Sequence, residues 1–104
     1  MADVQITWNL GTDLGNITST VVHKKASFGN SSNDCAQLGA LALAGDAGSL
    51  VHEDAPLSGP PTDTSFVDVG VGSGTWVYGV FAKNAAGVNP CDHSAGGSLA
   101  TITI

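Results

Sequence analysis

The chain has 104 residues, of which 42% are hydrophobic, so its length fits one domain and its composition excludes disorder along the whole chain. Nine acidic residues against three lysines, with no arginine, give a formal net charge of −6 at pH 7. Binding to nucleic acid or to an anionic membrane requires clustered cations, which this chain lacks. We therefore expect residues 1–104 to form a single domain whose partner is neither a nucleic acid nor a membrane.

Alternation of apolar and polar residues with a period of two predicts β-strands along most of the chain. The predicted strands cover residues 4–10, 17–25, 64–71, 75–83 and 98–104, with a further short strand at 50–52. In the first of them we expect Val4, Ile6, Trp8 and Leu10 to point inward, because successive side chains in a strand point to opposite faces. Loops are expected from composition at residues 11–16, 55–62 and 87–97.

The strand at 75–83 is apolar on both faces. Trp76, Tyr78 and Val80 share one face, and we expect them to anchor the core together with Trp8. In the strand at 64–71, we expect Val67, Val69 and Val71 to point inward and Phe66 outward. Gly-Ser-Gly at 72–74 joins these two strands, and its composition predicts a hairpin turn.

Residues 35–44 fit either a helix or a strand. Asp34 is a suitable N-cap with Gln37 three residues later, and Gly45 is a suitable end for a helix. Gly39 weakens a helix, however, and the rival interpretation is a strand at 37–44 that covers a sheet edge.

The aromatic strand carries a more specific pattern. After Trp76 the apolar residues alternate, and the strand closes on Ala82-x-Asn84-x-x-Gly87. This pattern resembles the penultimate strand of fibronectin type III domains, and Trp8 resembles the inward tryptophan of the family's second strand. The resemblance covers residues 4–25 and 64–104. It implies an all-β fold, an immunoglobulin-like antiparallel β-sandwich, with an insert at about 26–61.

One family element has no counterpart, because only three residues precede residue 4. Either the strand at 4–10 is itself a first strand, or one sheet begins with an unpaired edge. An unpaired edge accepts strands from other chains. We therefore expect a protein partner or self-association by strand addition at an open edge.

Outward apolar side chains suggest an interaction face. Phe66, Val77 and Phe81 fall on the faces assigned to solvent, and an exposed apolar cluster marks an interface. The alternative is that the segment 26–61 folds over this face and buries it.

Two cysteines, Cys35 and Cys91, form either one disulfide or two buried thiols. Three histidines accompany them, but the short ligand spacing of a structural zinc site is missing. We expect no metal and no cofactor.

The family resemblance implies a scaffold or adhesion module. We expect a non-catalytic structural or protein-interaction module on an exterior surface, either a virion decoration protein or part of an extracellular, cell-surface assembly. The alternative is a carbohydrate-binding module of a larger secreted protein, for which Trp8, Trp76 and Tyr78 are the stacking candidates.

No nucleophile, base and orienting group are recognisable, so we expect no enzyme. The first residues lack the basic and apolar parts of a signal peptide.

Overall fold

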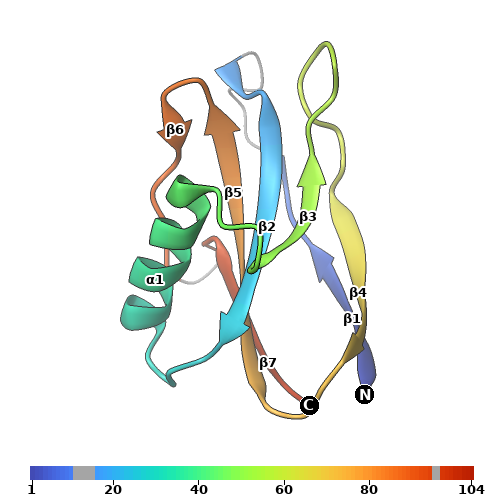
Figure 1. Ribbon diagram of the computed structural model, residues 1–104, viewed down its shortest axis with the longest axis vertical. Coiled ribbons are helices and arrows are strands. Elements are labelled where there is room, and N and C mark those ends of the chain that lie inside the picture. Colours follow the sequence, from blue (N-terminus) through green and yellow to red (C-terminus); the bar gives the residue numbers. More distant parts are fainter. Residues whose placement is uncertain (11–15, 95–96) are drawn as a thin grey trace.

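The computed structural model describes residues 1–10, 16–94 and 97–104 (Figure 1). Its elements are β1 (Ala2–Thr7), β2 (Ser19–Ala26), α1 (Ser31–Ala44), β3 (Leu50–Asp54), β4 (Ser65–Val71), β5 (Thr75–Asn84), β6 (Gly87–Val88) and β7 (Leu99–Thr103). The sheet-rich class predicted from the alternation is confirmed. Most of the loop predicted at 11–16 and part of the loop predicted at 87–97 lie outside the described residues.

The strands of the described residues form two antiparallel sheets. In the smaller sheet β1 pairs with β4, and in the larger sheet β3, β2 and β5 follow one another, with β6 and β7 both paired to β5. Helix α1 packs on one face of the larger sheet, and β1 and β4 pack on the other (Figure 1). The architecture is therefore β-sandwich-like, with a helix outside the larger sheet.

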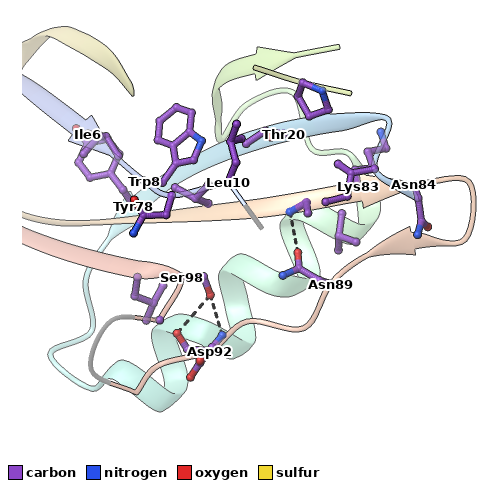
Figure 2. Close-up of a pocket in the computed structure, with 18 of the residues that line it drawn as sticks. Ile6, Trp8, Leu10, Thr20, Tyr78, Lys83, Asn84, Asn89, Asp92 and Ser98 are labelled. Carbon is purple, nitrogen blue, oxygen red and sulfur yellow. Dashed lines mark hydrogen bonds between the residues drawn. The ribbon is translucent and has the colours of Figure 1, made fainter. Parts of the chain in front are cut away.

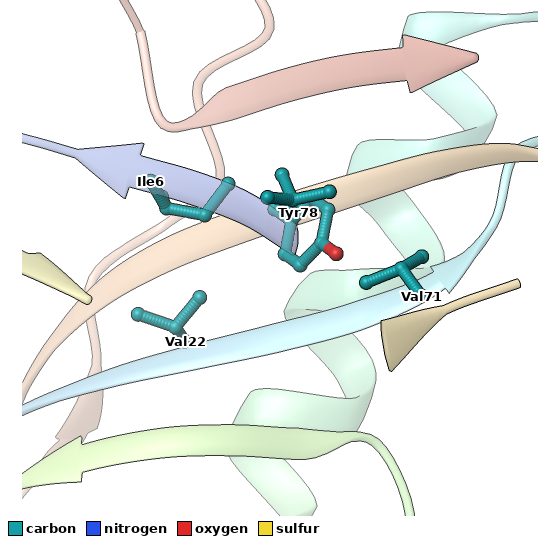
Figure 3. Packing of buried hydrophobic residues seen from close by; sticks show 5 residues of the cluster. Ile6, Val22, Val71 and Tyr78 are labelled. Carbon is teal, nitrogen blue, oxygen red and sulfur yellow. The ribbon is translucent and has the colours of Figure 1, made fainter. Parts of the chain in front are cut away.

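Strand β5 lies in the middle of these layers and is buried on both faces. Val77 and Phe81 have no exposed surface, and they pack with Leu38 of α1. Tyr78 points to the opposite face, where the buried cluster also contains Val4, Ile6, Val22 and Val71 (Figure 3). Burial on both faces explains why both faces of this strand are apolar.

The face assignment predicted for β4 is wrong for two of its three valines. Val67 and Val69 are 50% and 73% exposed, whereas Phe66 is half-buried against the inner cluster. Both faces of this strand carry apolar residues, so alternation alone does not choose between them. Val71 is buried all the same, because the register with β1 shifts near Gly70, whose φ is 73°. The extra residue of this β-bulge reverses which face the next side chain meets.

For residues 35–44 the helical interpretation is correct. The N-cap is Asn30, whose Oδ1 accepts hydrogen bonds from the backbone N–H groups of Ser32 and Asn33 at 3.0 and 3.2 Å. The predicted N-cap, Asp34, instead lies within the first turn. Gly45 ends the helix as predicted, in the left-handed conformation with φ 67°.

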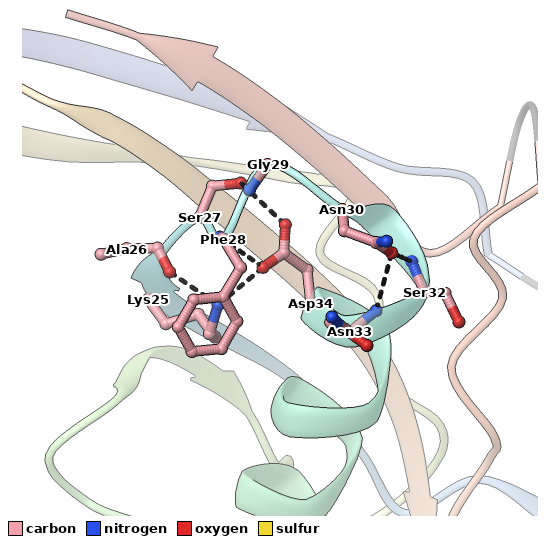
Figure 4. A network of polar contacts seen from close by, with 9 residues as sticks. All are labelled: Lys25, Ala26, Ser27, Phe28, Gly29, Asn30, Ser32, Asn33 and Asp34. Carbon is pink, nitrogen blue, oxygen red and sulfur yellow. Dashed lines mark hydrogen bonds and ion pairs between the residues drawn. The ribbon is translucent and has the colours of Figure 1, made fainter.

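Asp34 anchors this helix to the end of β2. Its side chain is 2% exposed and accepts hydrogen bonds from Lys25 Nζ at 2.7 Å, Ser27 Oγ at 2.7 Å and the Phe28 backbone N–H at 2.9 Å (Figure 4). Burial alone would raise the pKa of Asp34, but these hydrogen bonds outweigh burial and hold the pKa below its ordinary value. The carboxylate therefore stays charged and paired.

Gly79 on β5 allows α1 to lie close to the sheet. A Cβ atom at this position would lie 2.8 Å from the ring of Phe81 and 3.3 Å from Leu38. Any larger residue would push the helix or the ring away.

The predicted hairpin turn at 72–74 is a different kind of connection. Strand β4 pairs with β1, whereas β5 pairs with β2 in the other sheet. The turn therefore leads from one sheet to the other. A short Gly-Ser-Gly segment suits either connection, so its composition does not distinguish them.

Candidate interaction site

A groove of about 760 Å³ opens between the two sheets beside β1 (Figure 2). Trp8 and Leu10 line one wall, directly after β1. The half-buried Val80 and Ala82 of β5 line the groove beyond Tyr78, and Leu99 and Ala100 come from β7. Apolar side chains thus make up much of the lining, and Val80, Ala82 and Ala100 belong to the inner face of the larger sheet.

The larger sheet extends past the smaller one at this groove. Ala100 is the strand partner of Tyr78 and Ile102 is the partner of Trp76, so both residues share the inner face of the sheet. Yet Ala100 is exposed and Ile102 is 37% exposed. The inner face of β7 therefore lacks the cover that β1 and β4 give to β2 and β5.

The groove is bordered by one edge of β1 that no described strand pairs with. The Trp8 N–H donates to the Thr64 carbonyl at 2.9 Å, in register with the pairing of β1 and β4. Backbone groups in a strand alternate between its two edges. Ile6 therefore turns its backbone groups toward β4, whereas Gln5 and Thr7 turn their N–H and C=O groups away from β4, toward the open edge.

The groove offers few charges. Among the described residues that line it, only Lys83 and Asp92 are charged, and none is a histidine or a cysteine. Asp92 Oδ1 accepts hydrogen bonds from the Ser94 hydroxyl and backbone N–H, which lower the pKa of Asp92. Asn89 Oδ1 accepts from the Ala82 N–H at 2.7 Å. Such a surface offers a ligand apolar contact area and hydrogen-bond partners.

A polar bridge fixes the two sheets to each other near the core. Asp68 Oδ2 of β4 accepts hydrogen bonds from Lys24 Nζ of β2 and from the Tyr78 hydroxyl of β5, both at 2.8 Å. Burial and the Asp68 carboxylate both raise the pKa of Tyr78, so the hydroxyl remains a donor.

Replacing Tyr78 with phenylalanine removes one bond of this bridge and keeps the ring. We expect Tyr78→Phe to lower the free energy of unfolding by about 1.5 kcal/mol, the usual contribution of a hydrogen bond to a charged acceptor. Urea denaturation followed by tryptophan fluorescence measures the change. The exposed control Thr101→Ala should change it by less than about 0.5 kcal/mol. Equal stability of Tyr78→Phe and wild type would contradict a bridging role.

The proposed interaction face of Phe66, Val77 and Phe81 is not assembled. Val77 and Phe81 lie fully buried beneath α1, which belongs to the segment 26–61, so the alternative in which this segment covers them is the one observed. Phe66 lies on the other side of the sheet, stacked on the ring of His52 at a centroid distance of 4.9 Å.

Of the four predicted core anchors, Tyr78 belongs to the buried cluster, and the other three pack against that cluster with part of their surface exposed. Tyr78 is 1% exposed, and Trp8, Trp76 and Val80 are half-buried against the cluster. The Trp76 indole N–H donates to the Gly72 carbonyl at 2.9 Å. The indole nitrogen of Trp8 is buried, and within the described part of the chain it has no hydrogen-bond partner.

The two cysteines form a disulfide that joins α1 to the segment between β6 and β7.

Burial lowers the pKa of His23, whose Nδ1 lies 2.8 Å from Ser49 Oγ. His52 Nε2 lies 3.0 Å from Asp63 Oδ2. Within residues 1–10, 16–94 and 97–104, no three potential metal ligands cluster. The same residues contain no helix that is long and apolar enough to cross a membrane.

Sequence reasoning predicted an open edge but not the groove beside it. The groove depends on how far one sheet extends past the other, which no pattern in the sequence reveals. Comparisons with known protein families, with curated proteins and with solved structures found no match. The structure defines the class, a small sheet-rich domain whose described residues form two antiparallel sheets and one helix.

Proposed function

We propose that this chain is a non-catalytic structural or protein-interaction module of the immunoglobulin-like class, displayed on an exterior surface. The observation that carries the proposal is the apolar groove beside the open edge of β1. Concave surfaces that carry few charges and are bordered by unpaired strand edges suit polypeptide partners.

Strand pairing supports the immunoglobulin-like assignment. In that class, strands B and E pair in one sheet and strands C, F and G pair in the other, which variable-type domains extend by C′. Here β1 and β4 stand where B and E would, and β3, β2, β5 and β7 stand where C′, C, F and G would. Strands A and D then have no counterpart among the described residues, and the place of strand A is beside β1.

The disulfide supports an exterior location, because disulfides persist in oxidising surroundings. A virion decoration protein and a cell-surface module both fit this setting. In either case the rigid sandwich would hold the groove toward a neighbouring protein.

Peptide selection from a displayed random library tests the function. We expect peptides that bind the wild-type protein and lose at least about tenfold in affinity on Ala100→Arg, which places a charged side chain at the groove. The matched control is Thr101→Arg, also exposed but on the opposite face of β7. Selected peptides that bind both variants equally, or no peptides at all, would count against the proposal.

The second candidate is a carbohydrate-binding module. It is favoured by the half-buried ring of Trp8 in a groove that also holds the side chains of Asn84 and Asn89. A glycan array decides between the candidates. Binding that is lost on Trp8→Ala, in a variant that remains folded, would favour the carbohydrate function.

A further inference from the structure

We propose that the groove accepts a single β-strand from another polypeptide, neutral or basic in charge, which pairs antiparallel with the open edge of β1. The strand would complete the two-stranded sheet as its third member. This inference rests on the proposed function and names its partner: an extended segment with apolar residues at alternate positions.

The backbone of β1 is prepared for such a strand. Gln5 and Thr7 direct their N–H and C=O groups toward the open edge, while Ile6 is engaged with β4. Both residues are exposed. Every strand pair in the described part of the protein is antiparallel, and antiparallel pairing is the more stable kind per residue. An incoming antiparallel strand can therefore form backbone hydrogen bonds with the N–H and C=O groups of Gln5 and Thr7, which are two residues apart.

The side chains of the incoming strand would find an apolar floor. One face of an added strand points inward, and here that direction meets Val80 of β5 and the exposed Ala100 and Ile102 of β7. The other face points to solvent and takes polar residues.

Charge argues for a foreign strand rather than a second copy of this chain. Each copy carries a formal charge of −6, so two copies repel one another. The groove itself contributes one lysine and one aspartate among its described lining residues, and hence no net charge of its own. A neutral or basic segment avoids the repulsion and gains from the acidic surroundings.

A designed probe tests the inference. The probe is the capped peptide acetyl-Lys-Thr-Val-Thr-Ile-Thr-Val-Thr-Lys-amide, and its control has the same composition with the three apolar residues adjacent. With the probe at saturation, we expect amide exchange at Gln5 and Thr7 to slow by at least about tenfold, while the control peptide leaves it unchanged. Probe binding without protection at Gln5 and Thr7 would overturn the inference, as would protection confined to the edge of β3.

A proline substitution gives a second, independent test. Gln5→Pro removes an N–H group that faces the open edge and spares the bonds of β1 to β4, a position where strands tolerate proline. We expect it to abolish probe binding, whereas the matched variant Gln5→Ala, which keeps the N–H group, binds as wild type does. Equal probe binding by a folded Gln5→Pro variant would overturn the inference. If that variant does not fold, the exchange measurement on the wild-type protein decides.

The outcomes separate this inference from the proposed function. If selected peptides depend on Ala100 but leave the Gln5 and Thr7 amides unprotected, the groove binds peptides in another conformation, and only the strand inference fails. If no peptide engages the groove, both fail. A dimer in sedimentation that protects the same two amides without any peptide would identify a second copy as the occupant and overturn the choice of a foreign strand.

Discussion

Replacing Asp34 with alanine is expected to lower the free energy of unfolding by about 3–5 kcal/mol, the usual cost of removing one partner of a buried ion pair. The side chain is 2% exposed and holds Lys25 Nζ, Ser27 Oγ and the Phe28 N–H at once. Without the carboxylate, an ammonium group with 11% side-chain exposure loses its counter-charge. The first turn of α1 also loses a negative charge, which stabilises a helix N-terminus.

Urea denaturation at neutral pH measures this loss, and Asn33→Ala is the control. Asn33 occupies the same helical turn and is exposed, so its replacement should cost less than about 0.5 kcal/mol. A loss for Asp34→Ala no larger than that of Asn33→Ala would contradict the anchoring role of this carboxylate.

The contribution of the Asp34 carboxylate to the free energy of unfolding depends on pH with a definite sign. The pKa of Asp34 is lower in the folded protein than its ordinary value of about 3.9 in an unfolded chain. Its contribution to stability is therefore fully present above that value and is lost as the pH falls through the folded-state pKa. The stability difference between wild type and Asp34→Asn should shrink on acidification below about pH 4.

Removing the disulfide is expected to lower the free energy of unfolding by about 4 kcal/mol. Cys35 and Cys91 are 56 residues apart in the sequence, and closing a loop of this length restricts the unfolded chain by about that amount in the chain-entropy model. For a domain of this size, such a loss lowers the melting temperature by about 15–30 °C. The double variant Cys35→Ser/Cys91→Ser, followed by circular dichroism on heating, measures the change.

The reductant experiment supplies the control. Dithiothreitol should lower the melting temperature of the wild-type protein toward that of the double variant and leave the double variant unchanged. Alkylation without reductant should leave the mass of the wild-type protein unaltered. Two alkylated cysteines under those conditions would contradict the disulfide.

Strands were predictable where one face carried nearly all of the apolar residues. In β1 the alternation placed Val4 and Ile6 correctly because the other face is polar. In β4 it failed, since Phe66 competes with Val67 and Val69 for the interior and the bulge at Gly70 interrupts the period. Alternation with a period of two assigns the faces of a strand correctly only when the apolar residues lie on one face and no bulge interrupts the register.

The helix and the groove lay beyond the sequence for other reasons. Local propensity left 35–44 open. The helix is favoured locally by the Asn30 cap, and by two tertiary features, the anchoring of Asp34 and the space above Gly79. The groove depends on how far the larger sheet extends past β1, which is a property of strand pairing between distant segments. The groove leaves no periodic signal in the chain.

The decisive measurement is backbone amide exchange in the free protein, resolved residue by residue along β1. An open edge predicts slow exchange at Ile6, whose N–H group faces β4, and fast exchange at Gln5 and Thr7, with Val22 of the doubly paired β2 as the protected reference. Equal protection of Gln5, Ile6 and Thr7 in the monomeric protein would mean that this edge is already covered, and the proposed groove would have no strand to receive.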